Sequence, residues 1–246
     1  MAIESTNGAS TGRAAERAAI IAAALSLIAE EGYTRTSMTS IALKAGLKPA
    51  ALHRSFQTKD QILIAFFHDS LEASFNKVQA IDGFEDFSLQ EKLHALIETQ
   101  LEHLLPHREV LGVAVLAIGA RALRNSREMS ALRRRFEEII KGYVREAISK
   151  GELPDVNVEG LTVRSFTDLH STIVVYWLRD SSEGFTKTTE FINRSLELLV
   201  STLVMENRLG GMASFLFYPE SLGALASRRP VVSALLRKIF DGQRTS

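Results

Sequence analysis

The chain has 246 residues, 46% of them hydrophobic, and its 29 lysines and arginines balance 29 aspartates and glutamates. This apolar fraction is enough to build a sizeable core and excludes a wholly disordered chain. A neutral total argues against a protein coated in nucleic acid or lipid. The absence of cysteine excludes disulfides, iron–sulfur clusters, thiolate zinc sites and cysteine nucleophiles.

The N-terminal segment combines a polar stretch with an apolar one. Residues 1–12 are rich in serine, threonine and glycine and lack apolar periodicity, so we expect a disordered tail there. Arg13 and Arg17 then precede the apolar stretch Ala18–Ala29, as basic residues precede the core of a signal peptide. That stretch ends in Glu30-Glu31-Gly32 without a small-x-small cleavage site, and no apolar run reaches the roughly 20 residues of a membrane span. We therefore expect a cytoplasmic protein with no membrane span.

From residue 14 onward the sequence indicates one helix after another. Long stretches have the 3.6-residue apolar period, and the five prolines are spaced like helix boundaries. The segment Thr172–Trp177 is β-branched and aromatic, but it lies inside a long helical pattern and is interpreted as buried helix. The expected helices cover residues 14–31, 38–45, 49–55, 59–80, 88–105, 107–123, 126–150, 157–180, 186–207, 212–227 and 230–241.

The predicted fold is therefore all-α. A small N-terminal domain of three helices over 13–58 is fused, through the fourth helix, to a larger helical bundle over 59–208. Residues 209–246 form a predicted C-terminal helical extension. We favour packing of this extension on the body over a role in a dimer interface or on a membrane surface.

Residues 32–59 contain five basic residues and no acidic residue, which is unusual in a neutral chain. Ser37 can cap a short helix, Gly46 can adopt the positive φ of a tight turn, and Pro49 takes the first position of the next helix. The apolar residues that would pack the two helices across the turn are Ile41, Ala42, Leu47, Leu52 and Phe56. This pattern favours a helix-turn-helix, which places its second helix in the DNA major groove, over an ordinary helical hairpin.

The segment Ile20–Leu63 resembles the DNA-binding domain of the tetracycline-repressor (TetR) family of bacterial regulators. The matching residues are Ile20, Ala23, Ala24, Leu27, Glu31-Gly32-Tyr33, Thr36-Ser37-Met38, Ile41-Ala42, Ala45-Gly46-Leu47, Leu52, Phe56, Lys59 and Leu63. The resemblance implies a homodimeric repressor that binds a palindromic operator on double-stranded DNA and a ligand in its helical body. No GxSxG, HExxH, P-loop or GxGxxG pattern follows a strand, so we expect neither an enzyme nor a cofactor.

Candidate DNA contacts lie in and around the second helix of this motif. Its exposed half carries Lys48, Ala50, Ala51 and His53; lysine and histidine can reach guanine or phosphate, and alanine a thymine methyl. Lys59 resembles the family's phosphate-binding lysine. The other candidates for phosphate contacts are Thr36, Ser37, Thr39 and Arg54, of which Arg54 has pairing with an acidic residue as an equal alternative.

Three residues differ from the usual pattern of the family. His53 stands where the family usually has a tyrosine packed near a phosphate, and Ser55 stands where an aromatic residue or a histidine is usual. Lys48 stands where a small hydroxyl residue often caps the recognition helix. A missing cap costs about 1 kcal/mol, and a charge that faces DNA is one reason to tolerate that cost.

The body carries large apolar residues on successive helices, and some of them are candidates to line a ligand cavity. The candidate lining residues are Phe67, Leu71, Leu101, Val113, Phe136, Tyr143, Phe166, His170, Ile173 and Tyr176. No charged residue dominates these faces, so we expect a small apolar or aromatic effector, with Tyr143, His170 or Tyr176 as a polar anchor. The eighth and ninth expected helices form the expected dimer pair, through Trp177, Leu178, Phe191, Leu196, Leu199 and Leu203.

Two further patterns in the sequence bear on metal binding and on an alternative function. His103 and His107 have the i,i+4 spacing of a metal pair, but Pro106 lies between them and no HExxH accompanies them, so no metal site is expected. Residues 177–194 also resemble the related lipid-binding proteins of ubiquinone biosynthesis, which keep the fold and bind isoprenoid lipid. The alternative function is therefore a TetR-like lipid-binding protein without DNA binding, against which the basic, acid-free run 32–59 argues.

Overall fold

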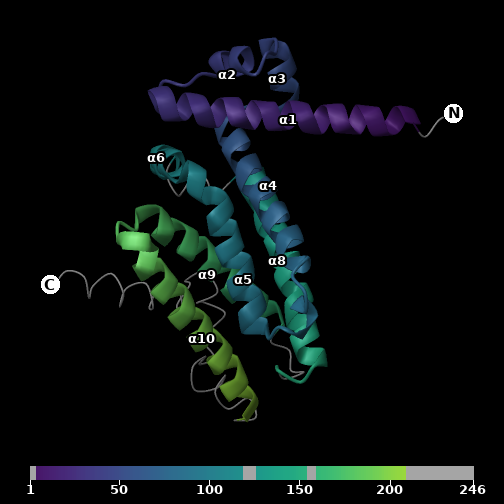
Figure 1. Cartoon of the computed structure of the whole chain (residues 1–246), viewed down its shortest axis with the longest axis vertical. Coiled ribbons are helices and arrows are strands. Elements are labelled where there is room, and N and C mark those ends of the chain that lie inside the picture. The colour runs from purple at the N-terminus through teal and green to yellow at the C-terminus, as the bar shows by residue number, and fades with distance from the viewer. Residues whose placement is uncertain (1–3, 119–125, 154–158, 209–246) are drawn as a thin grey trace, which may run out of the picture. The chain divides into compact units, whose positions relative to one another are not determined.

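The computed structural model of the chain describes residues 4–118, 126–153 and 159–208 (Figure 1). Over these ranges it contains α-helices and short 3-10 helices and no strand, so the all-α prediction is confirmed, and Thr172–Trp177 lies inside a helix. The α-helices are α1 (Glu4–Glu31), α2 (Met38–Lys44), α3 (Pro49–Ser55), α4 (Lys59–Gln79), α5 (Leu89–Leu104), α6 (Arg108–Ile118), α8 (Arg127–Ser149), α9 (Glu159–Arg179) and α10 (Thr186–Arg208). The 3-10 helices are η1 (Phe84–Asp86), η2 (Leu105–His107) and η3 (Glu183–Phe185).

The observed bounds match the expected helices within a few residues, except at the first helix. Helix α1 begins at Glu4, whereas the sequence predicted a disordered tail over 1–12 and a helix from residue 14. The segment contains no proline, and Gly8 and Gly12 each cost a helix only about 1 kcal/mol relative to alanine. The structure therefore has helix over 4–12 in place of the expected tail. The expected helices near 212–227 and 230–241 lie outside the described residues.

The chain divides into two compact units. The first comprises residues 1–81 and 98–135, and the second comprises residues 82–97 and 136–246. Helices α5 and α8 thus contribute to both. These units do not follow the expected boundary at residue 58, because α4 packs against α1 in the first unit and belongs with it. The division into a DNA-binding domain over 13–58 and a body over 59–208 stays a functional prediction.

In the first unit, α1 packs against α2, α4 and α6, and α2 packs against α3. The residues that fill this core are almost completely buried and include Ile20, Ala24, Ile41, Leu52 and Ile62. Ile41 and Leu52 are among the residues that the sequence placed across the turn, and Ile20 and Ala24 are among those that match the TetR pattern. The core holds α3 so that its opposite side stays exposed.

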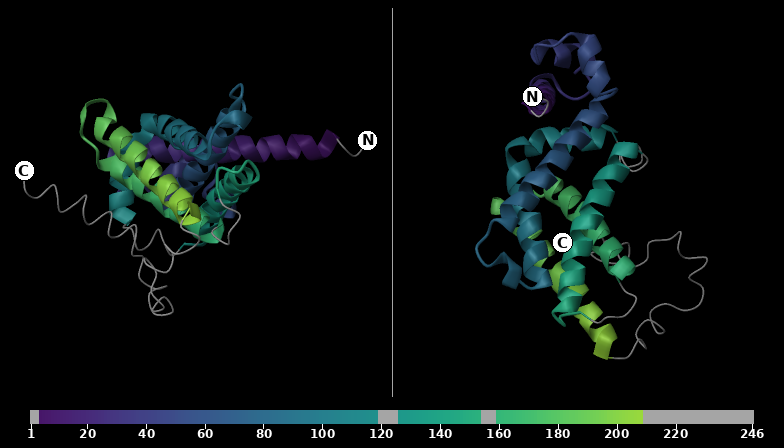
Figure 2. Two further views of the ribbon diagram at one scale, coloured as in Figure 1. Left: turned by 90° about the horizontal axis from the view of Figure 1, so that it is seen from below. Right: turned by 90° about the vertical axis from the view of Figure 1, so that its right-hand side faces the viewer.

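In the second unit, α9 and α10 lie side by side as a helical hairpin (Figures 1 and 2). Both helices carry buried residues, such as Ile173 and Trp177 in α9 and Phe191 and Leu196 in α10. The hairpin is closed by Asp180, whose carboxylate accepts hydrogen bonds from residues on the α10 side of the connection. None of the described helices is both long and apolar enough to cross a membrane.

Candidate nucleic-acid interface

The turn between α2 and α3 is built as the sequence predicted. Ser37 precedes α2, and its hydroxyl accepts the backbone N–H of Ser40 at 3.0 Å, while the Ser40 hydroxyl accepts the N–H of Ser37 at 3.0 Å. This reciprocal capping box fixes where α2 begins. Gly46 adopts a φ of 72°, which favours glycine, and the N–H of Leu47 donates to the carbonyl of Ala42 at 2.8 Å. The chain therefore reverses sharply into α3.

Helix α3 presents a short polar and small-residue face to solvent. Pro49 is its first residue and Lys48 its N-cap, with no side-chain hydrogen bond to the cap, so the poor cap that the sequence indicated is confirmed. Lys48, Ala50, His53 and Arg54 are exposed and Ala51 is partly exposed, whereas Leu52 is completely buried. Lys48 and Arg54 form no ion pair within the described part of the chain, which leaves their charges available to a ligand of negative charge.

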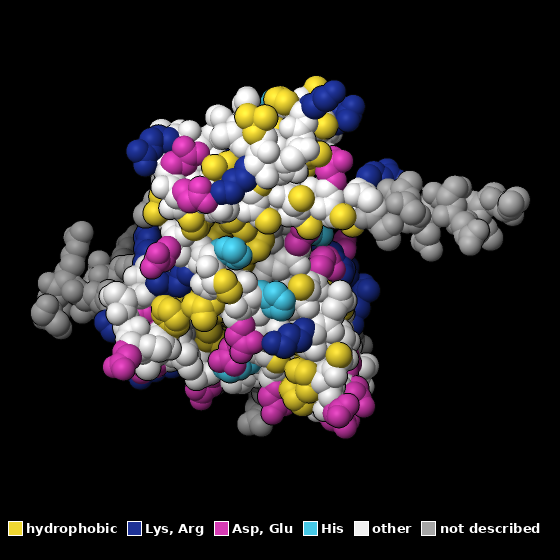
Figure 3. Space-filling view, turned by 45° about the horizontal axis from the view of Figure 1, so that its top comes forward, with side chains coloured by type: hydrophobic (Ala, Val, Ile, Leu, Met, Phe, Trp, Pro, Cys, Tyr) yellow, Lys and Arg dark blue, Asp and Glu magenta, His cyan; other side chains and the backbone are white. Residues whose placement is uncertain are grey.

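Two other basic residues of the run are used within the protein. Lys44 forms an ion pair with Glu30, and this contact lowers the pKa of the Glu30 carboxyl. Arg35 donates from Nε to the carbonyl of Glu31 at 2.5 Å. The acidic partner of Lys44 lies in α1, just before the acid-free run, so a count within the run could not reveal it. Basic and acidic side chains are accordingly interspersed on the face drawn in Figure 3, without one large basic patch.

Lys59, the first residue of α4, forms hydrogen bonds to the loop before α2. Its ammonium group donates to the carbonyls of Tyr33 and Thr36, both at 2.6 Å, and lies 4.3 Å from the centre of the Tyr33 ring. The Tyr33 hydroxyl in turn donates to the carboxylate of Asp60, and burial together with this carboxylate raises the pKa of Tyr33. An ammonium group has three donors, so one remains. The resemblance implied that Lys59 contacts a phosphate. This contact stays a prediction, and only the remaining N–H donor of Lys59 could make it.

The remaining candidates differ in exposure. Thr36 is 2% exposed, and its hydroxyl donates to the carbonyl of Gly32 at 2.9 Å. The structure therefore corrects its assignment as a phosphate contact, because the side chain is enclosed by the fold. Ser37 and Thr39 are exposed at the start of α2 and remain candidates.

The candidate ligand residues are divided between the two units. In the first unit, Leu71 and Leu101 are buried, Phe67 is partly exposed, and Val113 is 53% exposed. The exposed fraction of Val113 contradicts a place in the lining of a cavity, because α6 turns this side chain toward solvent.

In the second unit, the candidates Phe136, Tyr143, Phe166 and Ile173 are buried, and Tyr176 is partly exposed. The His170 ring stacks on Phe136 with 4.1 Å between ring centres, and burial lowers the pKa of His170 to about 4. His170 is therefore neutral near pH 7 and can act as a hydrogen-bond donor or acceptor without a charge.

The expected dimer residues also separate into two groups. Trp177, Phe191, Leu196 and Leu203 are buried within the single chain, so the structure corrects their assignment to a dimer interface. Leu178 and Leu199 are partly exposed. Two residues that the sequence reasoning missed, Val175 and Leu198, are 40% and 52% exposed. Val175 lies one turn before Leu178 in α9, so helical spacing could have found it, whereas Leu198 only adjoins Leu199 in α10 and does not share its spacing.

The histidine pair is engaged in other contacts. His103 Nδ1 lies 3.3 Å from the carbonyl oxygen of Thr99. His107 meets the Phe66 ring edge-on at 5.2 Å between centres, and burial lowers its pKa. Among the described residues, no group of three or more metal-binding side chains comes together.

Comparison with known families explains this arrangement. Residues 20–66 match the family described as bacterial regulatory proteins, tetR family, and residues 92–216 match tetracyclin repressor-like C-terminal domains. The chain belongs to the tetR family. This TetR-family protein is a ligand-responsive, DNA-binding transcriptional repressor and is not an enzyme. Proteins of the family bind DNA operators and work as dimers.

Several relatives show the same fold along most of the chain. The protein is 27% identical over 187 residues to the fatty acid metabolism regulator protein of Bacillus subtilis (strain 168), a match that covers 74% of this chain and 92% of that protein. The structure of FadR from Bacillus subtilis in complex with stearoyl-CoA is 23% identical, with a TM-score of 0.54 over 74% of this chain and 97% of that one. FadR from Bacillus halodurans is 20% identical, with a TM-score of 0.56 over 75% and 94% of the two chains.

Proposed function

We propose that this repressor responds to a long-chain acyl thioester. The observation that carries the proposal is the 27% identity to a fatty acid metabolism regulator over 74% of the chain. The apolar faces of the helical body support it, because an acyl chain is recognised mainly by burial of apolar surface. His170 and Tyr143 are the proposed polar anchors for the head of the ligand.

The proposed DNA contacts are the exposed side chains of the helix-turn-helix. Lys48, Ala50, Ala51, His53 and Arg54 face solvent on or beside α3, the helix that this motif places in the major groove. Ser37 and Thr39 are the proposed neutral phosphate contacts. The proposed location is the bacterial cytoplasm, because a regulator of this kind acts on the chromosome.

The proposed dimer uses the exposed apolar side chains of the α9–α10 hairpin. Val175, Leu178, Leu198 and Leu199 leave apolar surface open to solvent there. Two copies related by a twofold axis would present two recognition helices to half-sites about one helical turn, roughly 34 Å, apart or a multiple of it.

The experiment that tests this function begins with DNA selected by the protein from a pool of random duplexes. The selected sequences should contain an inverted repeat. Stearoyl-CoA at micromolar concentration should then release the selected duplex, whereas free coenzyme A should not, because it lacks the acyl chain. Release by coenzyme A alone, or by neither compound, would contradict the acyl ligand. Failure to select any DNA would favour a lipid-binding protein that does not bind DNA.

A further inference from the structure

Helix α8 contacts α4 at two places within the first unit. Near its start, Glu128 accepts a hydrogen bond from Gln61 Nε2 at 2.7 Å. Two turns later, Arg135 donates from both Nε and Nη2 to the carboxylate of Glu72, the second at 3.0 Å. The seven-residue spacing places Glu128 and Arg135 on one face of α8. These two contacts fix how the first turns of α8 lie along α4.

The first contact continues to the recognition helix through amide side chains. Gln61 Oε1 accepts the backbone N–H of Gln57 at 2.6 Å. Gln57 Nε2 then donates to the carbonyl of His53, also at 2.6 Å, in the last turn of α3. An unbroken series of three hydrogen bonds therefore joins Glu128 of α8 to the backbone of α3.

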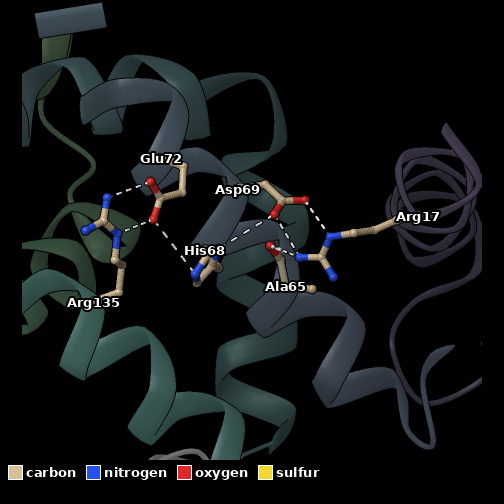
Figure 4. A network of polar contacts seen from close by, with 6 residues as sticks. All are labelled: Arg17, Ala65, His68, Asp69, Glu72 and Arg135. Atoms are coloured by element: carbon tan, nitrogen blue, oxygen red, sulfur yellow. Dashed lines mark hydrogen bonds and ion pairs between the residues drawn. The ribbon is translucent and has the colours of Figure 1, made fainter. Parts of the chain in front are cut away.

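The second contact continues through charged side chains (Figure 4). His68 lies between two carboxylates, with Nε2 3.9 Å from Glu72 Oε1 and Nδ1 3.8 Å from Asp69 Oδ1. Asp69 accepts hydrogen bonds from Nε and Nη2 of Arg17 in α1, at 3.2 and 2.7 Å. The Arg17 guanidinium also lies 5.6 Å from the centre of the ring of Phe56, which is the C-cap of α3. This second series thus ends at the same end of α3 as the first.

The exposure of these side chains limits what they add to stability. Those of Glu72 and Arg135 are 31% and 32% exposed, and those of Arg17 and Asp69 are 38% and 45% exposed. Ion pairs this open to solvent are screened and contribute little to the free energy of unfolding. The geometric effect of the contact between Arg135 and Glu72 is different. A bidentate arginine–carboxylate contact restricts the relative orientation of the two helices that carry it.

We propose that the first turns of α8 position the recognition helix for DNA, with Glu128 and Arg135 as the positioning residues. The inference rests on the proposed function, since DNA binding is what this position serves. Helix α8 continues past Arg135 into the second unit, where its next residue, Phe136, stacks on His170. A ligand that binds there and favours a different position of α8 would alter both contacts with α4 and, through them, the orientation of α3.

The first test measures operator affinity of variants that each lose one contact. Glu128→Ala and Arg135→Gln should weaken binding to the selected duplex by about 2- to 30-fold, the range expected for residues that couple two sites without touching the ligand. Arg134→Gln is the matched control, because Arg134 is adjacent, exposed and without interactions among the described residues. It removes the same charge and should change affinity less than about twofold. Glu128→Gln keeps an acceptor for Gln61 and should retain wild-type affinity.

The second test needs no DNA. Hydrogen exchange at the Gln57 amide should be faster in Glu128→Ala than in wild type, because Gln61 loses the contact that holds its side chain. The rate should be unchanged in Glu128→Gln and Arg134→Gln. The proposal requires both effects, and it is overturned if Glu128→Ala and Arg135→Gln bind the operator as Arg134→Gln does, or if exchange at Gln57 does not change. A wild type that selects no DNA refutes the proposed function instead, while the exchange rates still decide whether α8 is coupled to α3.

Discussion

The basic side chains between Gly32 and Lys59 have different surroundings and therefore different roles. Lys44 is paired with Glu30, and Lys59 is bound to two backbone carbonyls. Lys48 and Arg54 form no ion pair with the described residues. Lys44 is already neutralised by Glu30 and should release few counterions from DNA, and Lys59 has only one donor left, so the attraction to phosphates should come mainly from Lys48 and Arg54.

This difference predicts how binding depends on salt. Lys48→Ala should weaken operator binding and reduce the slope of log affinity against log salt concentration by about two units for a bound dimer, since each of the two protomers loses one phosphate contact. Lys44→Ala removes the same charge from the same motif but should leave the slope unchanged. Operator titrations at several potassium chloride concentrations measure both slopes. Equal changes in the two variants would show that the ion pair with Glu30 does not decide which lysine meets DNA.

Lys59 should matter for stability. Lys59→Met leaves the carbonyls of Tyr33 and Thr36 without their donor, which should lower the free energy of unfolding by about 1–3 kcal/mol. Lys48→Met, at an exposed position, should stay within about 0.5 kcal/mol of wild type. Denaturant unfolding of the three proteins measures the difference. If the Lys59→Met protein is as stable as wild type, Lys59 has no role in stability and only the predicted phosphate contact remains.

At the scale of helices and turns, the sequence predicted best where one residue restricts the backbone. Pro49 and Gly46 have strong local preferences, and α3 spans Pro49–Ser55 as expected. The start of α1 was missed because the composition of 1–12 indicated disorder, while no residue there blocks a helix. The short 3-10 helices, such as η1 (Phe84–Asp86), were missed because three residues show no periodicity.

The connection between α9 and α10 depends on one buried carboxylate. Asp180 accepts hydrogen bonds from the N–H and hydroxyl groups of Ser182 and Thr188, at 2.6–2.9 Å. Burial alone would raise the pKa of Asp180, but these hydrogen bonds outweigh it and lower the pKa to about 2. The carboxylate is thus more acidic in the folded protein than in the unfolded chain, where its pKa is near 3.9.

The sign of this shift predicts an acid-labile hairpin. The stabilisation is fully present above about pH 4 and is lost as pH falls from there toward pH 2. Asp180→Asn should lower the free energy of unfolding at pH 7 by on the order of 2 kcal/mol and flatten its decline below pH 4. Asp82→Asn, an exposed position, is the control. Unfolding curves between pH 7 and 3 measure the decline, and parallel curves for wild type and Asp180→Asn would refute this role.

At the scale of the whole molecule, an apolar stripe shows that a helix face is covered, but not by what. Trp177, Phe191, Leu196 and Leu203 were predicted at a dimer interface and are instead buried within one chain. The same ambiguity applies to Thr36, whose residue type suits a phosphate contact but whose side chain is buried. The helix-turn-helix was predictable because its turn residues are specific, whereas exposure depends on contacts between distant segments.

The exposed apolar side chains of the α9–α10 hairpin therefore give the sharpest test of assembly. Val175→Glu together with Leu198→Glu should convert a dimer into a folded monomer, because a twofold axis brings like charges from both copies into one apolar contact. Leu196→Glu, at a buried position, should unfold the hairpin instead. Leu43→Glu is the matched control, since Leu43 is 68% exposed in α2, far along the chain from the hairpin. Sedimentation at micromolar concentration should show a dimer for wild type and Leu43→Glu and a monomer for the double variant, with unchanged helical circular dichroism. If the double variant remains dimeric, Val175 and Leu198 do not lie in the dimer interface.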